Sequence, residues 1–305
     1  MKLCQYIAGL ALAAVSTAAS ALTFPLQPGQ DIVGHVQTIT VGQDINITHI
    51  AQQYDVGYYQ LVEANQGKDI NHLQTGDQLT IPTQYIIPNV PRRGIVINQA
   101  EMRLFYFPPN KHEVVTYPVG IGRAGWNTPV TVAKIIEKKA HPTWFVPQSI
   151  QRDLALQGIQ SPKSIPAGPG NPLGPYMLRL SMPTYLIHGS NDASTVGRRS
   201  SSGCIHLYNP DITALFAAVP VGTRVNIINN PYLFGFKNNQ LYLEAHSPID
   251  KGVGVPITNL TVVTNSLMHW SSLHPQLIVN LGKAVTVAEQ ERGLATPVAQ
   301  FKPQQ

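Results

Sequence analysis

Two neighbouring stretches of the chain carry the decisive chemistry: YLIHGS at residues 185–190 and RRSSSGCIHL at residues 198–207. Acyl transfer by a thiol requires a nucleophilic sulfur, a nearby imidazole that handles its proton, and donors for a tetrahedral oxyanion. Cys204 and His188 supply the first two groups, and the 15 residues between them can form a loop that brings their side chains together. Gly203 places no side chain between a substrate and the backbone.

Spacing alone leaves structural alternatives open, because a histidine is often a satisfied surface or core residue and a lone cysteine is often an inert small hydrophobe. The cysteine count favours reactivity. Cys4 lies in the segment that we expect to be removed on export, so Cys204 is the one cysteine expected in the mature chain. An exported chain with one thiol cannot form an internal disulfide, which suggests a reactive cysteine.

The first 21 residues are typical of an export signal. Lys2 gives the positive start, Ile7 to Val15 form an apolar run, and Ala19-Ser20-Ala21 is a cleavage site of the A-x-A type. The run is short for a membrane span, and no later segment reaches 18 apolar residues; an uncleaved anchor is the alternative. We therefore expect a periplasmic protein that is processed after Ala21.

The composition indicates a globular, strand-rich protein. The 305 residues are 43% hydrophobic and 12% charged, which excludes disorder as the main state and suggests two domains. The 24 glycines and 25 prolines disfavour a helical bundle. The net charge of +5 comes without a dense Lys/Arg run, so we expect no nucleic-acid partner, although an anionic polymer such as a cell wall would attract the protein.

Short segments rich in β-branched and aromatic residues predict a mainly β region over residues 94–230. The expected strands cover residues 95–97, 102–107, 114–119, 131–137, 177–180 and 225–228. A helix should follow Asn209, with Pro210 in its first position. The Pro/Gly-rich stretch from Ser161 to Pro175 is long enough to be a lid or a binding wall.

The regions on either side of this part are less clearly patterned. Residues 22–34 form a leader, and residues 83–93 read as a stiff linker. Residues 231–305 form a C-terminal extension with no assigned role; we expect a strand at 241–246, a helix at 283–292 and a loose tail from residue 296.

Residues 35–82 resemble a LysM module. The resemblance rests on VGQD at 41–44, IAQQYDV at 50–56, and LQTGDQLTIP at 73–82, within a strand–helix–helix–strand pattern in which Asp44 is the expected N-cap. It implies binding of peptidoglycan or chitin glycan in a groove between loops 42–45 and 65–72. A module that only packs on its neighbour is the alternative.

Residues 94–230 resemble the L,D-transpeptidase catalytic domain of the YkuD family, in which a histidine and a loop precede Ser/Thr-x-Gly-Cys. His188-Gly189 and Ser201-Ser202-Gly203-Cys204-Ile205 fit this motif. NPLGPYML at 171–178 and PDI at 210–212 are similar to the branch that includes the ErfK and YbiS proteins. The resemblance implies a β-sandwich or barrel catalytic domain. His206 stands where relatives often have Arg or Asn.

The resemblance also implies a role for each matching residue. Cys204 would be the nucleophile and His188 its base and imidazolium partner, oriented by the carbonyl of Gly189. Backbone N–H groups of Gly203 and Cys204 would form the oxyanion hole. The expected substrate-binding residues are Arg198, Arg199, Ser201, Ser202, His206 and Tyr176. The two arginines would pair with stem-peptide carboxylates unless they form a solvated loop pair, and a structural role for His206 is the alternative.

The implied reaction is attack of Cys204 on a peptidoglycan tetrapeptide stem, release of D-alanine, and transfer of the acyl group to an amine. That amine would belong to another stem, giving a 3→3 cross-link, or to a lysine of an outer-membrane lipoprotein; water as acceptor would make a carboxypeptidase. No metal motif such as His-Glu-x-x-His is present, so we expect no cofactor. A non-catalytic wall-binding protein and a cysteine peptidase remain as alternatives.

Overall fold

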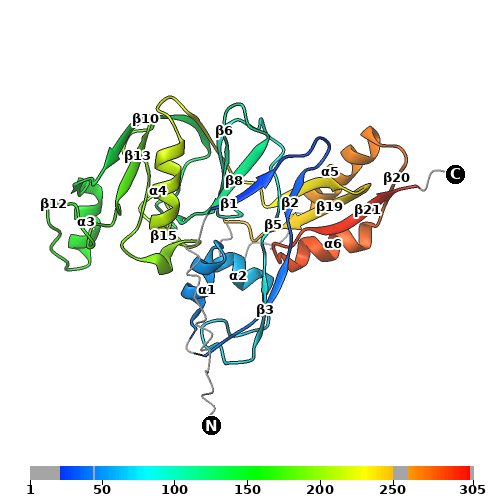
Figure 1. Cartoon of the computed structure of the whole chain (residues 1–305), viewed down its shortest axis with the longest axis horizontal. Helices are drawn as coiled ribbons and strands as arrows, with labels where there is room; N and C mark the ends of the chain where they lie inside the picture. Colours follow the sequence, from blue (N-terminus) through cyan, green and yellow to red (C-terminus); the bar gives the residue numbers. More distant parts are fainter. Residues whose placement is uncertain (1–20, 44, 250–259, 303–305) are drawn as a thin grey trace, which may run out of the picture.

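The computed structural model describes residues 21–43, 45–249 and 260–302. The expected export signal, except Ala21, therefore lies outside the described residues, as do Cys4 and Asp44. Figure 1 shows a central β structure, the segment with α1 and α2 below it, and a C-terminal unit to its right. Strands predominate, as the sequence predicts. Within the described residues, no helix has the length and apolarity needed to cross a membrane.

A mixed sheet forms the centre of the molecule. Its strand order is β1 (Leu22–Pro25), β8 (Glu113–Pro118), β7 (Arg103–Phe107), β6 (Gly94–Asn98), β17 (Arg224–Ile228), β10 (Thr131–Ala140), β13 (Tyr176–Leu180), β14 (Leu186–His188) and β16 (Ile205–His206). The six strands expected in this region are confirmed. Their buried aliphatic side chains form one core with Ile212 and Leu215 of α4 (Asn209–Ala218). This helix begins at Asn209 itself, one residue before its expected start, so Pro210 takes the second helical position instead of the first.

The leader and the linker both contribute strands to sheets, which corrects the expectation that residues 22–34 are only a leader and residues 83–93 a stiff linker. Leu22–Pro25 pairs with β8 at the edge of the central sheet, and β2 (Ile32–Gly34) pairs with β5 (Gln84–Ile86). Tyr85 and Ile86 are fully buried. The flanking prolines suggested a stiff spacer. The apolar side chains between them are instead buried, because removing apolar surface from water stabilises the folded chain.

The LysM-like segment has the expected order of elements. Strands β3 (Gln37–Thr40) and β4 (Gln78–Ile81) pair antiparallel, and α1 (Ile47–Gln53) and α2 (Tyr58–Ala64) lie between them in sequence. The N-cap of α1 is Asn46, two residues after the expected cap Asp44, and its side chain accepts the N–H of His49 at 2.9 Å. Such an asparagine satisfies one of the free donors of the first turn.

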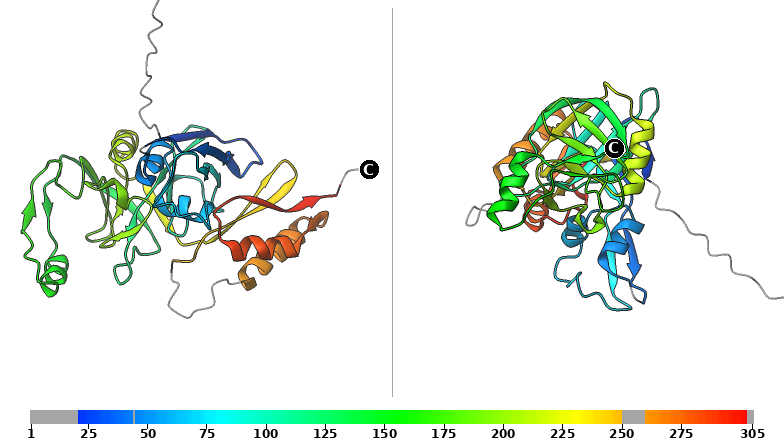
Figure 2. Two further views of the ribbon diagram at one scale, coloured as in Figure 1. Left: turned by 90° about the horizontal axis from the view of Figure 1, so that it is seen from below. Right: turned by 90° about the vertical axis from the view of Figure 1, so that its left-hand side faces the viewer.

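Residues 232–301 contain a C-terminal α/β unit. Its sheet has the order β18 (Tyr232–Lys237), β19 (Gln240–Ala245), β21 (Thr296–Phe301) and β20 (Leu277–Val279), with α5 (Leu260–Leu273) and α6 (Leu281–Gln290) packed on it (Figure 2). The expected strand and helix are confirmed. The expected loose tail is wrong: residues 296–301 form β21, which pairs on both sides and buries Val298.

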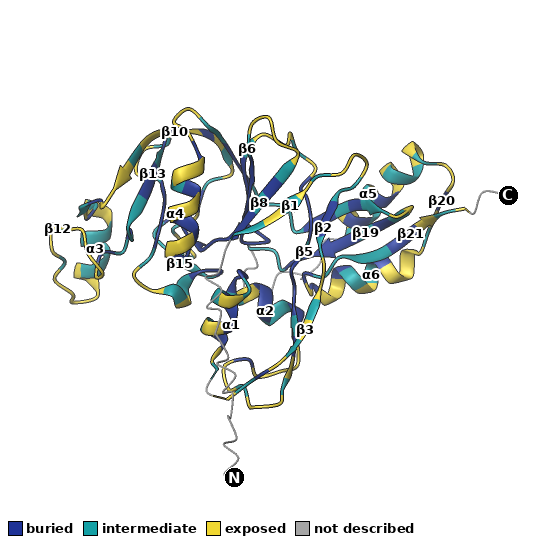
Figure 3. Cartoon of the chain, viewed as in Figure 1, coloured by how far each residue is buried: buried dark blue, intermediate teal, exposed yellow. Residues whose placement is uncertain are grey.

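The remaining elements surround the loops of the two decisive stretches. They are β9 (Ile121–Gly122), β11 (Trp144–Phe145), α3 (Gln148–Leu156), β12 (Ser164–Ile165), the 3-10 turn η1 (Ala193–Thr195) and β15 (Arg199–Ser201). The lobe of β11, α3 and β12 projects from the body in Figure 2. Helix α3 buries none of its residues (Figure 3). Its last residue, Leu156, is 89% exposed.

Candidate active site

Parallel pairing of β14 with β16 brings the two decisive stretches together. Ile187 is opposite Ile205 and His188 is opposite His206 in this pair. Cys204 immediately precedes β16, so it lies two residues before His206, the partner of His188. Side chains alternate across a strand: the apolar residues Ile187 and Ile205 face the core, while Cys204 and His188 face the opposite side.

His188 and Cys204 open into one cavity of about 580 Å³. Lys139, Met177, Arg179 and Leu186 contribute from the sheet, with Trp144 and Ile150 from the projecting lobe among the other wall residues. Pro172 and Leu173 belong to the Pro/Gly-rich stretch that the sequence suggests as a binding wall, and they do line the cavity. The thiol is therefore accessible to a substrate of peptide size.

The ring of His188 is held in a defined state. Nδ1 lies 2.6 Å from the carbonyl oxygen of Gly189, which accepts its N–H and leaves Nε2 with the lone pair that a base needs. Gly189 itself is tightly enclosed: a Cβ there would lie 2.5 Å from Oδ1 of Asn209. Burial lowers the pKa of His188 to about 3, assisted by the charge of His206. The free protein therefore holds a neutral imidazole.

The thiol of Cys204 is also neutral at rest. Burial raises the pKa of this thiol to about 11, although the N–H of Leu186 and the charge of Arg179 favour the thiolate. The sulfur lies 3.7 Å from the carbonyl oxygen of Thr184, to which its S–H donates. The two pKa shifts argue against a resting thiolate–imidazolium pair. Burial removes water from both groups, and the interactions that stabilise each charged form do not offset this cost. The shifts favour proton transfer during attack.

We expect alkylation of Cys204 by iodoacetamide to show which state is present. Thiolate is the reactive form, so a thiol pKa of about 11 predicts a rate that rises roughly tenfold per pH unit between pH 7 and 10. Because His188 is neutral above about pH 3, its titration adds no step to the pH dependence of the alkylation rate in this range. Stopped-time mass spectrometry measures the rate. A rate that is constant between pH 5 and 9 would instead demonstrate a resting ion pair.

One of the two expected oxyanion donors is already engaged. The N–H of Gly203 donates to Oγ of Ser201 at 3.1 Å, while that hydroxyl donates to the carbonyl oxygen of Cys204 at 2.6 Å. Gly203 adopts a φ of +106°, a conformation that favours glycine, and this turn presents Cys204 to the cavity. In the described part of the chain, the N–H of Cys204 has no protein acceptor, so it is the better oxyanion donor.

Ser201 and Ser202 both line the cavity, but they make different hydrogen bonds. Ser201 closes the turn around Cys204. Ser202 accepts a hydrogen bond from Nη1 of Arg123 at 3.1 Å, and Nη2 of Arg123 lies 2.7 Å from a carboxylate oxygen of Asp153. Because Asp153 lies in α3, this chain of contacts connects the projecting lobe to the turn that carries the thiol.

Four of the expected substrate-binding residues lie outside the cavity wall. Arg198 stacks on the ring of Tyr58 in α2, with its guanidinium carbon 3.2 Å from the ring centroid. Arg199 donates to the carbonyl oxygens of Gly122 and Ile249 and to Oδ1 of Asn127, and is thereby used in loop packing. The position of both side chains is set by contacts across the fold that sequence spacing does not reveal.

His206 and Tyr176 are likewise packed away from the cavity. The ring of His206 stacks on that of His188 at a centroid distance of 6.0 Å, and its Nε2 lies 3.1 Å from the carbonyl oxygen of Thr195. This arrangement agrees with the structural alternative for His206. Tyr176 packs on Phe216 of α4, with ring centroids 4.4 Å apart.

The sequence analysis missed two cations that do line the cavity, Lys139 and Arg179. In the pairing of β10 with β13, Lys139 is opposite Met177 and Glu137 is opposite Arg179; Arg179 and Glu137 are 2.6 Å apart. A signal was present, because Met177 and Arg179 alternate with the buried Leu178 and therefore share one face of the strand.

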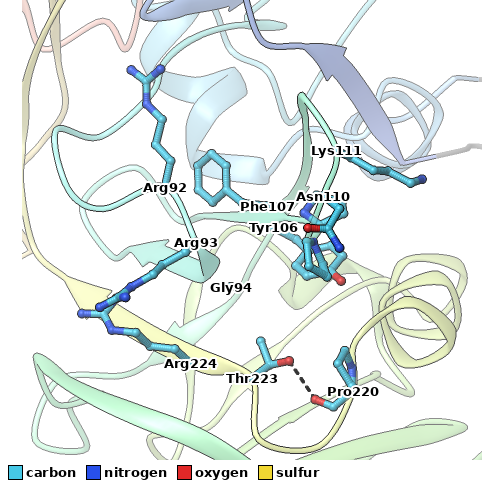
Figure 4. Close-up of a pocket in the computed structure, with 12 residues that line it drawn as sticks. Arg92, Arg93, Gly94, Tyr106, Phe107, Asn110, Lys111, Pro220, Thr223 and Arg224 are labelled. Carbon is cyan, nitrogen blue, oxygen red and sulfur yellow. Dashed lines mark hydrogen bonds between the residues drawn. The ribbon is translucent and has the colours of Figure 1, made fainter.

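A second cavity of about 450 Å³ lies at the other end of the sheet, where Arg93, Arg224 and Lys111 are cationic wall residues (Figure 4). Its lining contains no cysteine, histidine or carboxylate. It therefore lacks the thiol and imidazole that acyl transfer by a cysteine requires, and the cavity at Cys204 is the candidate active site.

Comparison with known proteins gives both modules a family. Residues 92–227 match the YkuD family, described as the L,D-transpeptidase catalytic domain, and residues 39–82 match the LysM domain. The chain is 41% identical over 265 residues to the probable L,D-transpeptidase YcfS of Escherichia coli strain K12, which covers 85% of this chain and 83% of that protein.

Two further relatives from the same strain extend over most of both chains. The probable L,D-transpeptidase ErfK/SrfK is 40% identical over 273 residues, covering 85% of this chain and 87% of that protein. The probable L,D-transpeptidase YbiS is 39% identical over 249 residues, with 80% and 81% covered. Similarity of this degree and extent, on a chain whose thiol and imidazole share one cavity, means that the protein belongs to the L,D-transpeptidase family and combines a YkuD catalytic domain with a LysM domain.

Proposed function

We propose that this L,D-transpeptidase acts on tetrapeptide stems of peptidoglycan through an acyl-enzyme on Cys204. One observation carries the proposal: Sγ of Cys204 and the ring of His188 open into the same cavity, with His188 held by the carbonyl oxygen of Gly189 at 2.6 Å. A neutral thiol beside a neutral imidazole with a free Nε2 is the resting state that general-base activation requires.

In the first half-reaction, the sulfur of Cys204 attacks the carbonyl carbon of the L-centre that precedes the terminal D-alanine. Nε2 of His188 takes the thiol proton as the S–C bond forms, and the N–H of Cys204 faces the developing oxyanion. Collapse of this intermediate breaks the C–N bond. His188 returns the proton to the leaving amine, so free D-alanine departs and a thioester remains.

In the second half-reaction, an acceptor amine attacks the thioester carbon. His188 removes a proton from the amine and gives it to the departing sulfur, so the amide forms and the thiol of Cys204 is regenerated. An amine from another stem would give a 3→3 cross-link, and a lysine of an outer-membrane lipoprotein would give an anchored protein. Water as acceptor would give a trimmed stem, which is the carboxypeptidase alternative.

The charge of the cavity suits an anionic peptide. Lys139 and Arg179 line the same wall as His188, and Glu137 neutralises only one of these two cations. Carboxylates of a stem peptide would therefore be attracted to the wall formed by β10 and β13. We assign substrate binding to these two residues, in place of Arg198 and Arg199.

The LysM domain supports a glycan-binding role, which would hold the enzyme on the polymer that bears its substrate. Within the expected groove, Asn65 is used structurally: its side chain bonds to backbone atoms of Leu61 and Thr80. The other loop residues are the better candidates for glycan contact. Loss of sacculus binding on deletion of this domain would be informative only alongside a check that the remaining chain folds.

The reaction is tested by incubating purified protein with a disaccharide-tetrapeptide, alone and with Nα-acetyl-lysine or a peptide that ends in lysine. We expect products that have lost D-alanine and gained the acceptor amine, seen by mass spectrometry. A tripeptide stem as the sole product would show a carboxypeptidase. Binding to sacculi without any product from any acceptor would favour the non-catalytic wall-binding protein.

We also propose that the chain is exported and cleaved after Ala21. The described structure gives this cleavage a consequence, because the backbone nitrogen of Leu22 donates to Oδ2 of Asp55 at 3.3 Å. Cleavage would turn that amide into an α-ammonium group, charged at neutral pH. Asp55 is 2% exposed, and burial raises its pKa, so a new positive charge beside it would favour the carboxylate.

We therefore expect a chain that starts at Leu22 to be more stable than one extended by two residues. A hydrogen bond to a charged group contributes about 1.5–3 kcal/mol, which corresponds to roughly 2–5 °C in Tm for a protein of this size. Calorimetry on the two chains measures the difference, and Asp55→Asn should remove most of it. Equal Tm values for the two chains would exclude this role of the new terminus.

A further inference from the structure

A second cluster of chemistry-bearing side chains lies far from the thiol, where three parts of the chain meet. Glu101 comes from the turn between β6 and β7, Glu244 from β19, and His246 follows β19. Each offers a ligand atom that lies within 4.8 Å of the other two. All three residues are at least 98% buried, which is unusual for two neighbouring carboxylates.

The histidine has the arrangement found in protein metal sites. Nε2 of His246 lies 2.9 Å from Oε1 of Glu244, and Nδ1 lies 2.9 Å from Oε2 of Glu63 in α2. A ligating histidine commonly donates its other ring N–H to a carboxylate, which orients the ring. Glu63 can serve as that carboxylate, and it is itself held by the N–H of Ser247 at 3.1 Å.

The two carboxylates of the cluster differ in the hydrogen bonds that they accept. Oε2 of Glu244 accepts the N–H of Ile86 at 2.8 Å. Glu101 is 1% exposed, and its Oε1 has no hydrogen-bond partner among the described residues. Its other oxygen has only a long contact of 3.4 Å with the side chain of Asn98. An unpartnered buried carboxylate oxygen beside a second carboxylate and an imidazole is an incomplete electrostatic arrangement.

We propose that Glu101, Glu244 and His246 bind a first-row divalent cation such as Zn²⁺, with Glu63 orienting the imidazole. Tetrahedral Zn²⁺ holds nitrogen and oxygen ligands about 2.0–2.2 Å away, so the ligand atoms lie roughly 3.3–3.6 Å from one another. The observed separations of 2.9 Å to at most 4.8 Å span that value. Small side-chain adjustments would therefore complete the site.

Charge and packing support the cation. Three carboxylates, those of Glu63, Glu101 and Glu244, surround one imidazole, which is an excess of negative charge. A divalent ion would neutralise this excess. Gly293, with φ +58°, closes over the ring: a Cβ there would lie 2.9 Å from Cε1 of His246 and 3.1 Å from Oε2 of Glu63. The ring is thus confined in the orientation that the site needs.

The site would join the modules of the enzyme. Glu63 belongs to the LysM domain, Glu101 to the catalytic domain, and Glu244 and His246 to the C-terminal unit. Nearby contacts follow the same junction: Nη2 of Arg292 donates to the carbonyl oxygen of Ala64 at 3.1 Å. We therefore assign the cation a structural role, setting the relative orientation of the modules, and none in the acyl transfer at Cys204.

The test uses the full processed chain carrying Cys204→Ala, since a free thiol also binds Zn²⁺. Protein treated with chelator is titrated with Zn²⁺ by calorimetry, and its Tm is followed. We expect one bound equivalent, and a Tm rise of about 4–5 °C when free Zn²⁺ exceeds the Kd a hundredfold. Absence of binding, with Tm unchanged by Zn²⁺, would overturn the proposal. Glu101, Glu244 and His246 would then be a cluster held together by shared protons.

Variants locate the bound ion. Glu101→Gln, nearly identical in shape, and His246→Gln should each weaken Zn²⁺ binding at least tenfold and abolish the Tm rise, while Glu63→Gln should weaken binding about tenfold or more. His72→Ala removes an exposed histidine that pairs with Asp69 and should leave binding unchanged. Zn²⁺ binding that survives Glu101→Gln but is lost in His72→Ala would place the ion on the surface. These readouts do not involve catalysis, so they are independent of the proposed function.

Discussion

Replacement of Cys204 by alanine is expected to lower the rate of D-alanine release by at least ~10³-fold, because no other group at the site can form the acyl-enzyme. The side chain is small and half-buried, and it donates a hydrogen bond to the carbonyl oxygen of Thr184 at 3.7 Å. Stability should therefore change little. The rate of D-alanine release from disaccharide-tetrapeptide measures the effect, with circular dichroism as the check on folding.

A matched control for this experiment is Met268→Ala, a change at a side chain that is 70% exposed on α5. Its rate should remain within about twofold of the unsubstituted protein, since surface substitutions away from special features have small effects. Covalent trapping adds a direct readout: the unsubstituted protein should gain the mass of the acyl group, and the alanine variant should not. D-Alanine release that persists in Cys204→Ala would show that the nucleophile lies elsewhere.

Replacement of His188 by glutamine is expected to reduce the same rate by about 10²–10⁴-fold, the usual contribution of a positioned general base. The pKa of His188, lowered to about 3, keeps the imidazole neutral throughout the working range. The variant should therefore lose turnover at every pH between 5 and 9. Iodoacetamide should still alkylate its thiol at pH 10, where a thiolate forms without a base.

His206 provides the matched comparison, because its ring stacks on that of His188 but does not line the cavity. His206→Gln can still donate to the carbonyl oxygen of Thr195, the contact that the ring makes at 3.1 Å. We expect a loss of less than about tenfold, with any larger effect accompanied by a lower Tm. If His206→Gln lost as much turnover as His188→Gln at an unchanged Tm, our assignment of His188 as the base would be wrong.

The cations around the cavity show that residues close to the cysteine motif in sequence need not line the cavity. Arg198 and Arg199 flank the cysteine motif in sequence, yet they face Tyr58 and the loop around Asn127. Lys139 and Arg179 are distant from the motif in sequence, and β10 and β13 bring them to the cavity. A cation close in sequence to a nucleophile is thus no guide to its place in the site, because loop packing decides the direction of each side chain.

Local chemistry alone determined the elements with strong patterns in this protein. Short segments rich in β-branched and aromatic residues specify the central strands, Pro210 marks the start of α4, and the glycine and serines before Cys204 produce the turn that exposes the thiol, since each depends on neighbours a few residues away. Only the tertiary structure decided what depends on desolvation and on distant partners. It made His188 and Cys204 neutral by burial, paired β21 into a sheet, and gathered Glu101, Glu244 and His246 from separate parts of the chain. The physical reason is that burial and long-range contact arise from the packing of whole modules, which no short stretch of sequence contains.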